Sequence, residues 1–203
     1  MPRIVVPFRG ADAKRRLSSL RPTERRALAH AMLADVLTAA TTVGRTLLVT
    51  PAKAVQARAL ADVAGAEVVD DPGRGQGEAV LHALRTLDDG PVLVVNADLP
   101  CVQPADLLAL LGRLPPGGLA LVEAADGTTN ALALSSPRLF EKLYGAGSAA
   151  RFRRHAEGLD VPWADATLPA LAQDVDRVAD LEALDGRLGP VTAAVREGLL
   201  AAA

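Results

Sequence analysis

The chain has 203 residues, of which 50% are hydrophobic and only 2% are aromatic. Its 22 Lys and Arg residues nearly balance its 24 Asp and Glu residues, and the formal net charge of −2 argues against a general nucleic-acid or membrane-surface binder. A single cysteine, Cys101, excludes an internal disulfide and a multi-cysteine zinc site. We expect one domain over residues 1–203, with a core built mainly of Ala, Leu and Val.

The chain carries no visible targeting signal, because Met1 leads directly into a strand-like pattern. No apolar run reaches the roughly 18 residues that a membrane helix requires. A lone cysteine fits a reducing compartment. We therefore expect a cytoplasmic protein whose partners are neither membranes nor nucleic acid.

Basic side chains are concentrated near the N-terminus. Residues 1–30 hold eight Lys and Arg residues (Arg3, Arg9, Lys14, Arg15, Arg16, Arg21, Arg25 and Arg26) against Asp12 and Glu24. Such a segment would suit a polyanionic substrate if it faced an acidic metal site. For Arg25 and Arg26, a solvated helix face is an equally good interpretation.

Strand and helix patterns alternate through the first half of the chain. Apolar runs predict strands at Arg3–Phe8, Thr46–Thr50, Glu67–Val69 and Pro91–Val95, and the last, as the most apolar, is expected to be central. Helices are predicted from Pro22, over Ala52–Ala64, from the loop Gly73–Gly77 through Leu87, and from Pro104. This order predicts an α/β fold with a parallel sheet covered on both faces and ligands at the carboxyl ends of its strands.

The pattern changes after Leu119–Val122. Thr129–Leu134 is a further strand candidate, and the loop Tyr144–Ser148 opens a predicted helix. Helices are also predicted over Val178–Leu184 and Leu188–Ala203, with Gly189-Pro190 breaking the last from its predecessor. No internal repeat or long linker divides the chain.

Three aspartates are the strongest candidates for a metal site. Asp98 follows the most apolar strand, and Asp174 and Asp176 are spaced so that both point to one face of an extended segment. Three carboxylates brought together repel one another unless a cation lies among them, and oxygen ligands suit Mg²⁺. The alternative is a turn before Pro100 for Asp98 and an exposed loop for the other two.

Two glycine-containing loops are candidates for anion binding. Gly73–Gly77 offers unhindered N–H groups before a predicted helix and would suit an anion or a nucleobase edge, although a plain flexible loop explains it equally well. The segment Gly145–Ser148 places Ser148 at a possible helix N-cap. Gly127–Asn130 adds hydroxyl and amide groups at a strand start. An ordinary cap and an ordinary turn are the alternatives for these last two segments.

Taken in order, these pieces resemble the guanylyltransferases of coenzyme F(420) biosynthesis, which act on 2-phospho-L-lactate or phosphoenolpyruvate. The resemblance covers roughly residues 3–185 and lies in Val6–Arg9, Ala13–Leu17, Asp35–Leu37, Asp98–Pro100, Thr129–Leu132, Gly145–Ser148 and Asp174–Asp176. It implies a single nucleotidyltransferase-type, Rossmann-like domain with a mostly parallel sheet. It also implies transfer of GMP from GTP to the phosphate of a three-carbon acid, with release of pyrophosphate and hand-off of the product to the next transferase.

The resemblance implies a role for each matching residue. Asp98, Asp174 and Asp176 would hold Mg²⁺, Thr129, Gly145 and Ser148 would contact the acid, and Arg9 and Lys14 would contact the triphosphate. Arg9, Lys14 and Asp98 are therefore the predicted catalytic residues. Together with Arg9 and Lys14, Gly75 and Gly77 of the glycine loop are the predicted nucleotide-binding residues.

Two positions depart from the family pattern. Arg9 stands where the family often has Lys, and Gln76-Gly77 where it tends to have Leu-Asn. Phosphoenolpyruvate is the leading acceptor and 2-phospho-L-lactate the close alternative, while the Gln76-Gly77 departure leaves open a nucleotidyltransferase using CTP or a sugar phosphate. A non-catalytic nucleotide-binding regulator is the alternative from another class, and the intact aspartates argue against it.

Overall fold

The computed structural model describes residues 1–10, 17, 19–184 and 187–201. The strands are β1 (Arg3–Pro7), β2 (Arg45–Thr50), β3 (Glu67–Asp70), β4 (Val92–Val95), β5 (Leu119–Glu123), β6 (Thr129–Leu134) and β7 (Trp163–Asp165). The helices are α1 (Pro22–Val43), α2 (Val55–Ala64), α3 (Gln76–Leu84), α4 (Pro104–Arg113), the 3₁₀-helix η2 (Pro137–Leu139), α5 (Ser148–Gly158), α6 (Pro169–Ala172), α7 (Val178–Glu182) and α8 (Pro190–Ala201).

The seven strands within the described residues form one sheet in the order β3-β2-β1-β4-β6-β5-β7. Strand β1 pairs in parallel with β2 and β4, β2 with β3, and β5 with β7, whereas β6 runs antiparallel to both β4 and β5. The expected α/β fold with a mostly parallel sheet is confirmed. Strand β4 lies at its centre, as predicted from its apolar sequence.

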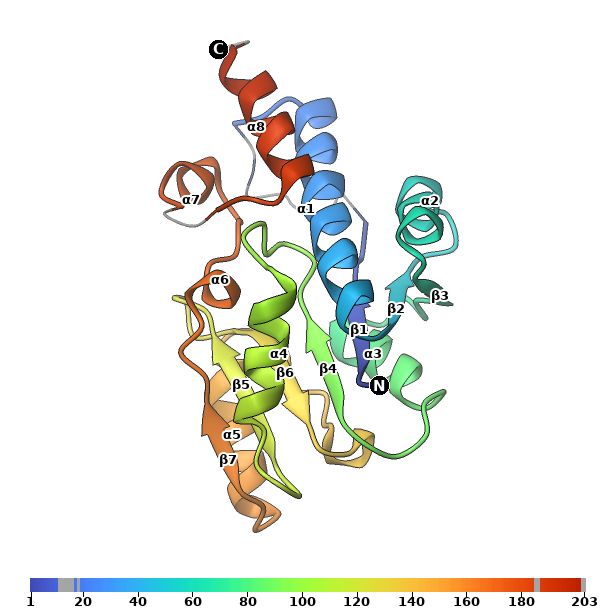
Figure 1. Ribbon diagram of the computed structural model, residues 1–203, viewed down its shortest axis with the longest axis vertical. Helices are drawn as coiled ribbons and strands as arrows, with labels where there is room; N and C mark the ends of the chain where they lie inside the picture. Colours follow the sequence, from blue (N-terminus) through green and yellow to red (C-terminus); the bar gives the residue numbers. More distant parts are fainter. Residues whose placement is uncertain (11–16, 18, 185–186, 202–203) are drawn as a thin grey trace.

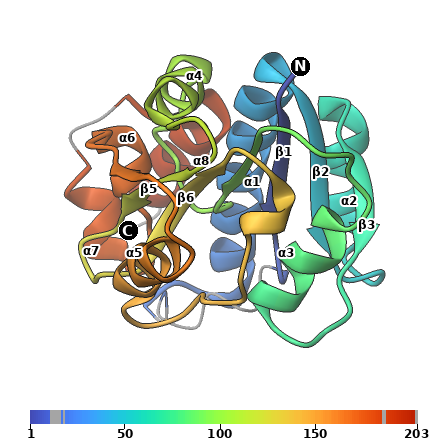
Figure 2. The ribbon, with the colours of Figure 1, turned by 90° about the horizontal axis from the view of Figure 1, so that it is seen from below.

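Helices cover both faces of the sheet (Figures 1 and 2). Helices α1, α2 and α4 bury Leu33, Ala57 and Leu110 in the core of one face, and α3 and α5 bury Val80 and Phe152 in the core of the other. Because helices cover both faces of the sheet, the sequences of the central strands are continuous apolar runs. No helix among the described residues combines the length and the hydropathy needed to span a bilayer.

Helix α8 lies beside α1 at one end of the molecule (Figure 1). The buried Asp35 carboxylate of α1 accepts hydrogen bonds from the backbone N–H groups of Val191 (3.1 Å) and Thr192 (2.8 Å), and so caps the first turn of α8. Just before this turn, the N–H of Gly189 donates to the carbonyl of Pro100 at 2.7 Å. The C-terminal helix is thereby tied both to α1 and to the loop that follows β4.

Several boundaries differ from those expected from the sequence. Helix α2 begins at Val55 rather than Ala52, α3 ends at Leu84 rather than Leu87, and α8 begins at Pro190 rather than Leu188. Strand β7 was not predicted, because it has only three residues and none of them is buried. Strand β6 is the antiparallel member of the mostly parallel sheet, and it returns beside β5 through a short connection as antiparallel neighbours can.

Candidate active site

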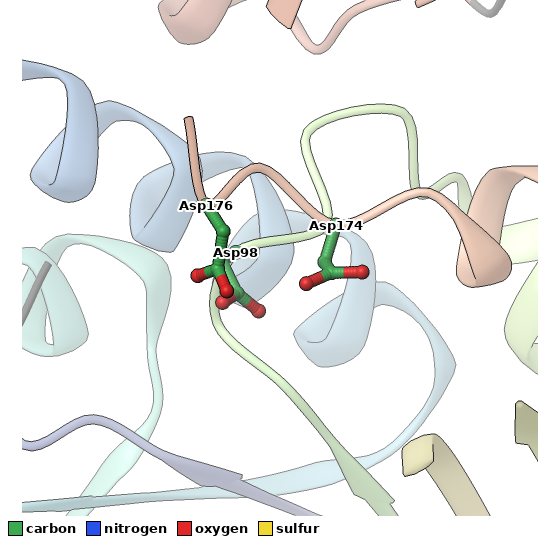
Figure 3. Close-up of side chains that lie close together, drawn as sticks. All are labelled: Asp98, Asp174 and Asp176. Carbon is green, nitrogen blue, oxygen red and sulfur yellow. The ribbon is translucent and has the colours of Figure 1, made fainter. Parts of the chain in front are cut away.

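The three predicted metal ligands lie together at the carboxyl end of the central strand. Asp98 is in the loop after β4, and Asp174 and Asp176 are in the segment between α6 and α7 (Figure 3). One oxygen from each carboxylate lies within 4.8 Å of the other two, and all three side chains are partly exposed. The structure therefore brings together residues that are more than seventy positions apart in the sequence.

The backbone of this segment explains how both aspartates face the cluster. Val175, between them, is fully buried in a small core with Leu28 and Met32 of α1. Its N–H donates to the carbonyl of Asp98 at 3.1 Å. Alternate residues of an extended segment point to opposite sides, so burying Val175 turns Asp174 and Asp176 toward Asp98.

The cluster has the chemistry of a divalent-cation site. Burial raises the pKa of the Asp174 carboxyl, and the nearby charges of Asp98 and Asp176 act in the same direction, whereas a hydrogen bond from Asn130 lowers it. The three carboxylates offer oxygen atoms close enough together for one divalent cation to bind among them, and such a cation would offset their mutual repulsion.

A polar cleft of about 510 Å³ opens beside the three carboxylates. Its lining comprises Arg9, Gln76, Asn96, Asp98, Asp126, Thr128, Thr129, Asn130, Tyr144, Gly145, Ala146, Asp174 and Asp176. A smaller cavity of about 190 Å³ also borders Asp98 and Asp176 and has an apolar wall of Pro7, Phe8, Ala29, Met32 and Ala97. Asp98 and Asp176 line both cavities, as do Arg9 and Gln76, so the two spaces meet at the aspartate cluster.

The predicted acceptor residues occupy one wall of the larger cleft. Thr129 and Gly145 line the cleft, whereas Ser148 is not among its lining residues. Ser148 is fully buried and donates its hydroxyl to the Thr129 hydroxyl at 3.0 Å. The N-cap of α5 is Gly147 rather than Ser148, and the left-handed backbone of Gly147, at φ 68°, favours glycine at that position.

Arg151 holds the loop before α5 in place, a role that was not predicted from the sequence. The Arg151 guanidinium donates to the carbonyl of Leu143 at 2.6 and 3.1 Å and also to the carbonyl of Ala146. Gly145, with φ 112°, adopts a backbone conformation that other residues rarely take. These bonds fix the part of the loop that faces the cleft.

Among the predicted nucleotide-binding residues that the structure describes, Arg9 lines the cavities, whereas Gly75 and Gly77 do not. Arg9 lines both, but Lys14 lies outside the described residues. Gly75 is the N-cap of α3 with φ 100°. Gly77 packs on Lys142, where an added Cβ would lie 2.9 Å from the Lys142 Cβ. Both glycines shape the start of α3, while the residue between them reaches the cleft.

Sequence reasoning missed Asn96 as a cleft residue, and it noted Gln76 and Asn130 without giving either a contact in the site. A signal was present, because Asn96 and Asn130 are polar residues within otherwise apolar segments. Asp126 and Tyr144 were also missed as cleft residues. They belong to loops whose approach to the aspartates depends on the fold rather than on local sequence.

Comparison with known proteins finds relatives that are named guanylyltransferases. A phosphoenolpyruvate guanylyltransferase from Sphaerobacter thermophilus is 39% identical over 203 residues, covering 95% of this chain and 96% of that protein. A 2-phospho-L-lactate guanylyltransferase from Natrialba magadii is 35% identical over 192 residues, covering 88% and 80%. A solved nucleotidyl transferase from Methanothermobacter thermautotroptrophicus has the same fold, with a TM-score of 0.66 at 18% identity over 90% of this chain and 94% of that one.

A family model described as guanylyl transferase CofC like matches residues 2–183, which include every element from β1 to α7 and all three aspartates. The resemblance noted in the sequence is therefore confirmed, and the protein is a transferase. The chain belongs to the CofC-like guanylyltransferase family.

Proposed function

We propose that this protein transfers GMP from GTP to the phosphate of phosphoenolpyruvate in a Mg²⁺-dependent reaction of coenzyme F(420) biosynthesis. The observation that carries the proposal is the convergence of Asp98, Asp174 and Asp176 at the meeting point of two cavities. The acceptor is taken from relatives such as that of Sphaerobacter thermophilus, whose name gives phosphoenolpyruvate.

The reaction is a displacement at the α-phosphorus of GTP. An oxygen of the acceptor phosphate forms a bond to that phosphorus, and the bond to the β-phosphate oxygen breaks, so that pyrophosphate leaves with the electron pair. The acceptor phosphate is already an anion, so the step needs no general base. Positioning and charge neutralisation therefore supply the catalysis.

Each predicted site residue has a place in this scheme. Asp98, Asp174 and Asp176 would hold Mg²⁺, which would neutralise charge on the reacting phosphates. Arg9, between the two cavities, would bind phosphate oxygens at the junction of nucleotide and acceptor. Thr129 and the Gly145 backbone, supported by Ser148, would orient the three-carbon acid in the larger cleft.

Two alternatives concern the substrates. The relative from Natrialba magadii favours 2-phospho-L-lactate as the acceptor in place of phosphoenolpyruvate. Gln76 lines both cavities, and it stands at a position where this chain departs from the family pattern. Nucleotides other than GTP should therefore be tested as substrates. Hand-off of the product to the next transferase and a cytoplasmic location stay predictions.

The test is a panel of pyrophosphate-release assays. GTP, CTP and ATP would each be combined with phosphoenolpyruvate, 2-phospho-L-lactate or a sugar 1-phosphate, with and without Mg²⁺. We expect the highest kcat/KM for GTP with phosphoenolpyruvate and no release without the metal. A preference for 2-phospho-L-lactate would correct the acceptor alone, whereas a preference for CTP or a sugar phosphate would overturn the proposed activity.

A further inference from the structure

Three side-chain amides form a continuous row from α3 to the aspartate cluster. The Gln76 Nε2 donates to Asn96 Oδ1 at 2.8 Å, the Asn96 Nδ2 approaches Asn130 Oδ1 at 3.4 Å, and the Asn130 Nδ2 donates to Asp174 Oδ1 at 3.1 Å. Gln76 lies in the first turn of α3, Asn96 directly after β4, and Asn130 in β6. All three residues line the cleft, and the row ends on a predicted metal ligand.

The hydrogen-bonding partners determine which way the NH₂ group and the oxygen of each amide in this row point. An ionised carboxylate only accepts hydrogen bonds, so Asn130 must turn its NH₂ group toward Asp174 and its oxygen away. Asn96 must then present its own NH₂ group, which also donates to the carbonyl of Thr129 at 3.2 Å. The oxygen of Asn96 is left to accept from Gln76. Turning any one amide over would set two acceptors or two donors against each other.

The backbone makes the row rigid. Asn130 is 1% exposed on β6, and the N–H of Asn96 donates to the carbonyl of Asn130 at 2.9 Å, which extends the antiparallel pairing of β4 with β6. A donor held by two strands can fix the carboxylate it contacts more firmly than a donor on a loop. Asp174 needs such support because it lies outside any helix or strand.

We propose that Asn130 and Asn96 are positioning residues that hold the Asp174 carboxylate in the orientation required to bind the divalent cation. Gln76 completes the row by orienting Asn96. This inference rests on the proposed function only in taking Asp174 as a metal ligand. Partners that orient a metal ligand typically contribute 10- to 100-fold to metal affinity.

The test measures binding of Mn²⁺ alone, without nucleotide or acceptor, from the electron paramagnetic resonance signal of the free ion. Asn130→Leu removes the donor with little change in volume, and Asn130→Ala removes it with the side chain. Both should weaken Mn²⁺ binding by roughly 10-fold or more. Gln173→Ala, which deletes an amide next to Asp174 in the chain, is the matched control and should bind Mn²⁺ like the parent.

Asn96→Ala provides a second variant outside the strand, in case β6 does not tolerate substitution. It should weaken Mn²⁺ binding less than the Asn130 variants, because its effect passes through Asn130. Far-UV circular dichroism and thermal melting would confirm that each variant is folded. Parent-like Mn²⁺ affinity in a folded Asn130 variant, or in Asn96→Ala if the Asn130 variants do not fold, would overturn the inference.

Asp98→Ala separates the failure of this inference from the failure of the proposed function. If Asp98→Ala loses Mn²⁺ binding while the amide variants keep it, the metal site stands and the positioning role is wrong. If Asp98→Ala binds Mn²⁺ like the parent, the aspartate cluster is not the metal site, and both proposals fall.

Discussion

Asp98 supports the site through two separate groups. Its carboxylate joins the aspartate cluster, while its backbone carbonyl accepts the hydrogen bond from Val175 that holds the second segment in place. A substitution at Asp98 removes the first and leaves the second. The side chain can therefore be tested without dismantling the local structure.

Asp98→Ala should reduce kcat by at least about 10²-fold, the effect typical of removing one preorganised electrostatic group. The melting temperature should change little, because the partly exposed carboxylate is not part of the apolar core. Steady-state pyrophosphate release and a thermal melt would check the two parts. Near-parental turnover in saturating Mg²⁺ would contradict the metal assignment.

The hydroxyl pair of Thr129 and Ser148 provides a test of the acceptor wall. Thr129→Val keeps the side-chain shape but removes a hydroxyl at the cleft, and should raise the KM for the three-carbon acid by roughly 10-fold, as expected for one hydrogen bond to a charged group. Ser148→Ala acts through Thr129, so it should raise the same KM by a smaller factor. The KM for GTP should change less in both variants.

Those KM values would be measured with the other substrate saturating. A selective rise in the KM for GTP would show that the acceptor and nucleotide ends are exchanged in our assignment. If the Ser148 variant lost thermal stability with no change in either KM, its hydroxyl would be purely structural.

At the scale of elements, Asp35 of α1 caps the first turn of α8 and has no direct role in the proposed reaction. Asp35 belongs to one of the segments on which the sequence resemblance rested, yet its carboxylate is buried and accepts hydrogen bonds from two N–H groups of the C-terminal helix. Gly189 lies so close that an added Cβ would be 2.2 Å from the Asp35 Cγ. The segment Asp35–Leu37 therefore serves packing between helices rather than substrate binding.

Asp35→Ala should lower the free energy of unfolding by about 1–2 kcal/mol, the usual cost of losing a helix cap. Urea denaturation followed by circular dichroism would measure it, with Asp62→Ala, a change at an exposed position of α2, as the control. The KM values of the folded protein should stay near those of the parent. An unchanged unfolding midpoint would show that the Asp35 bonds contribute no net stability.

Most elements could be predicted from sequence because their apolar runs and helix starts are local signals. Strand β4 is a run of four buried residues, and α1 and α4 each begin with Pro at the first helical position. Strand β7 could not be predicted, because Trp163–Asp165 lies at the sheet edge, where it pairs with β5, and none of its three residues is buried. The direction of β6 depends on pairing across the sheet, which no local pattern specifies.

At the scale of the whole molecule, the aspartate cluster was predictable and the amide row was not. The spacing of Asp174 and Asp176 and the position of Asp98 after a buried strand each carry a local signal. Asn96 and Asn130 become neighbours only because β4 pairs antiparallel with β6. The prediction of Ser148 as an N-cap was wrong by one residue, since Ser148 is the first residue of α5 and Gly147 is its N-cap.

The central claim is nucleotidyl transfer at the aspartate cluster, and ³¹P nuclear magnetic resonance of the complete reaction tests it most directly. With GTP, phosphoenolpyruvate and Mg²⁺, we predict one pyrophosphate for each GTP consumed, together with a new pair of coupled resonances from an unsymmetrical diphosphate. In the same reaction time, the Asp98→Ala variant should form at most a trace of these products. Formation of orthophosphate and GDP in their place, or product formation by the Asp98→Ala variant at the rate of the parent, would contradict the account.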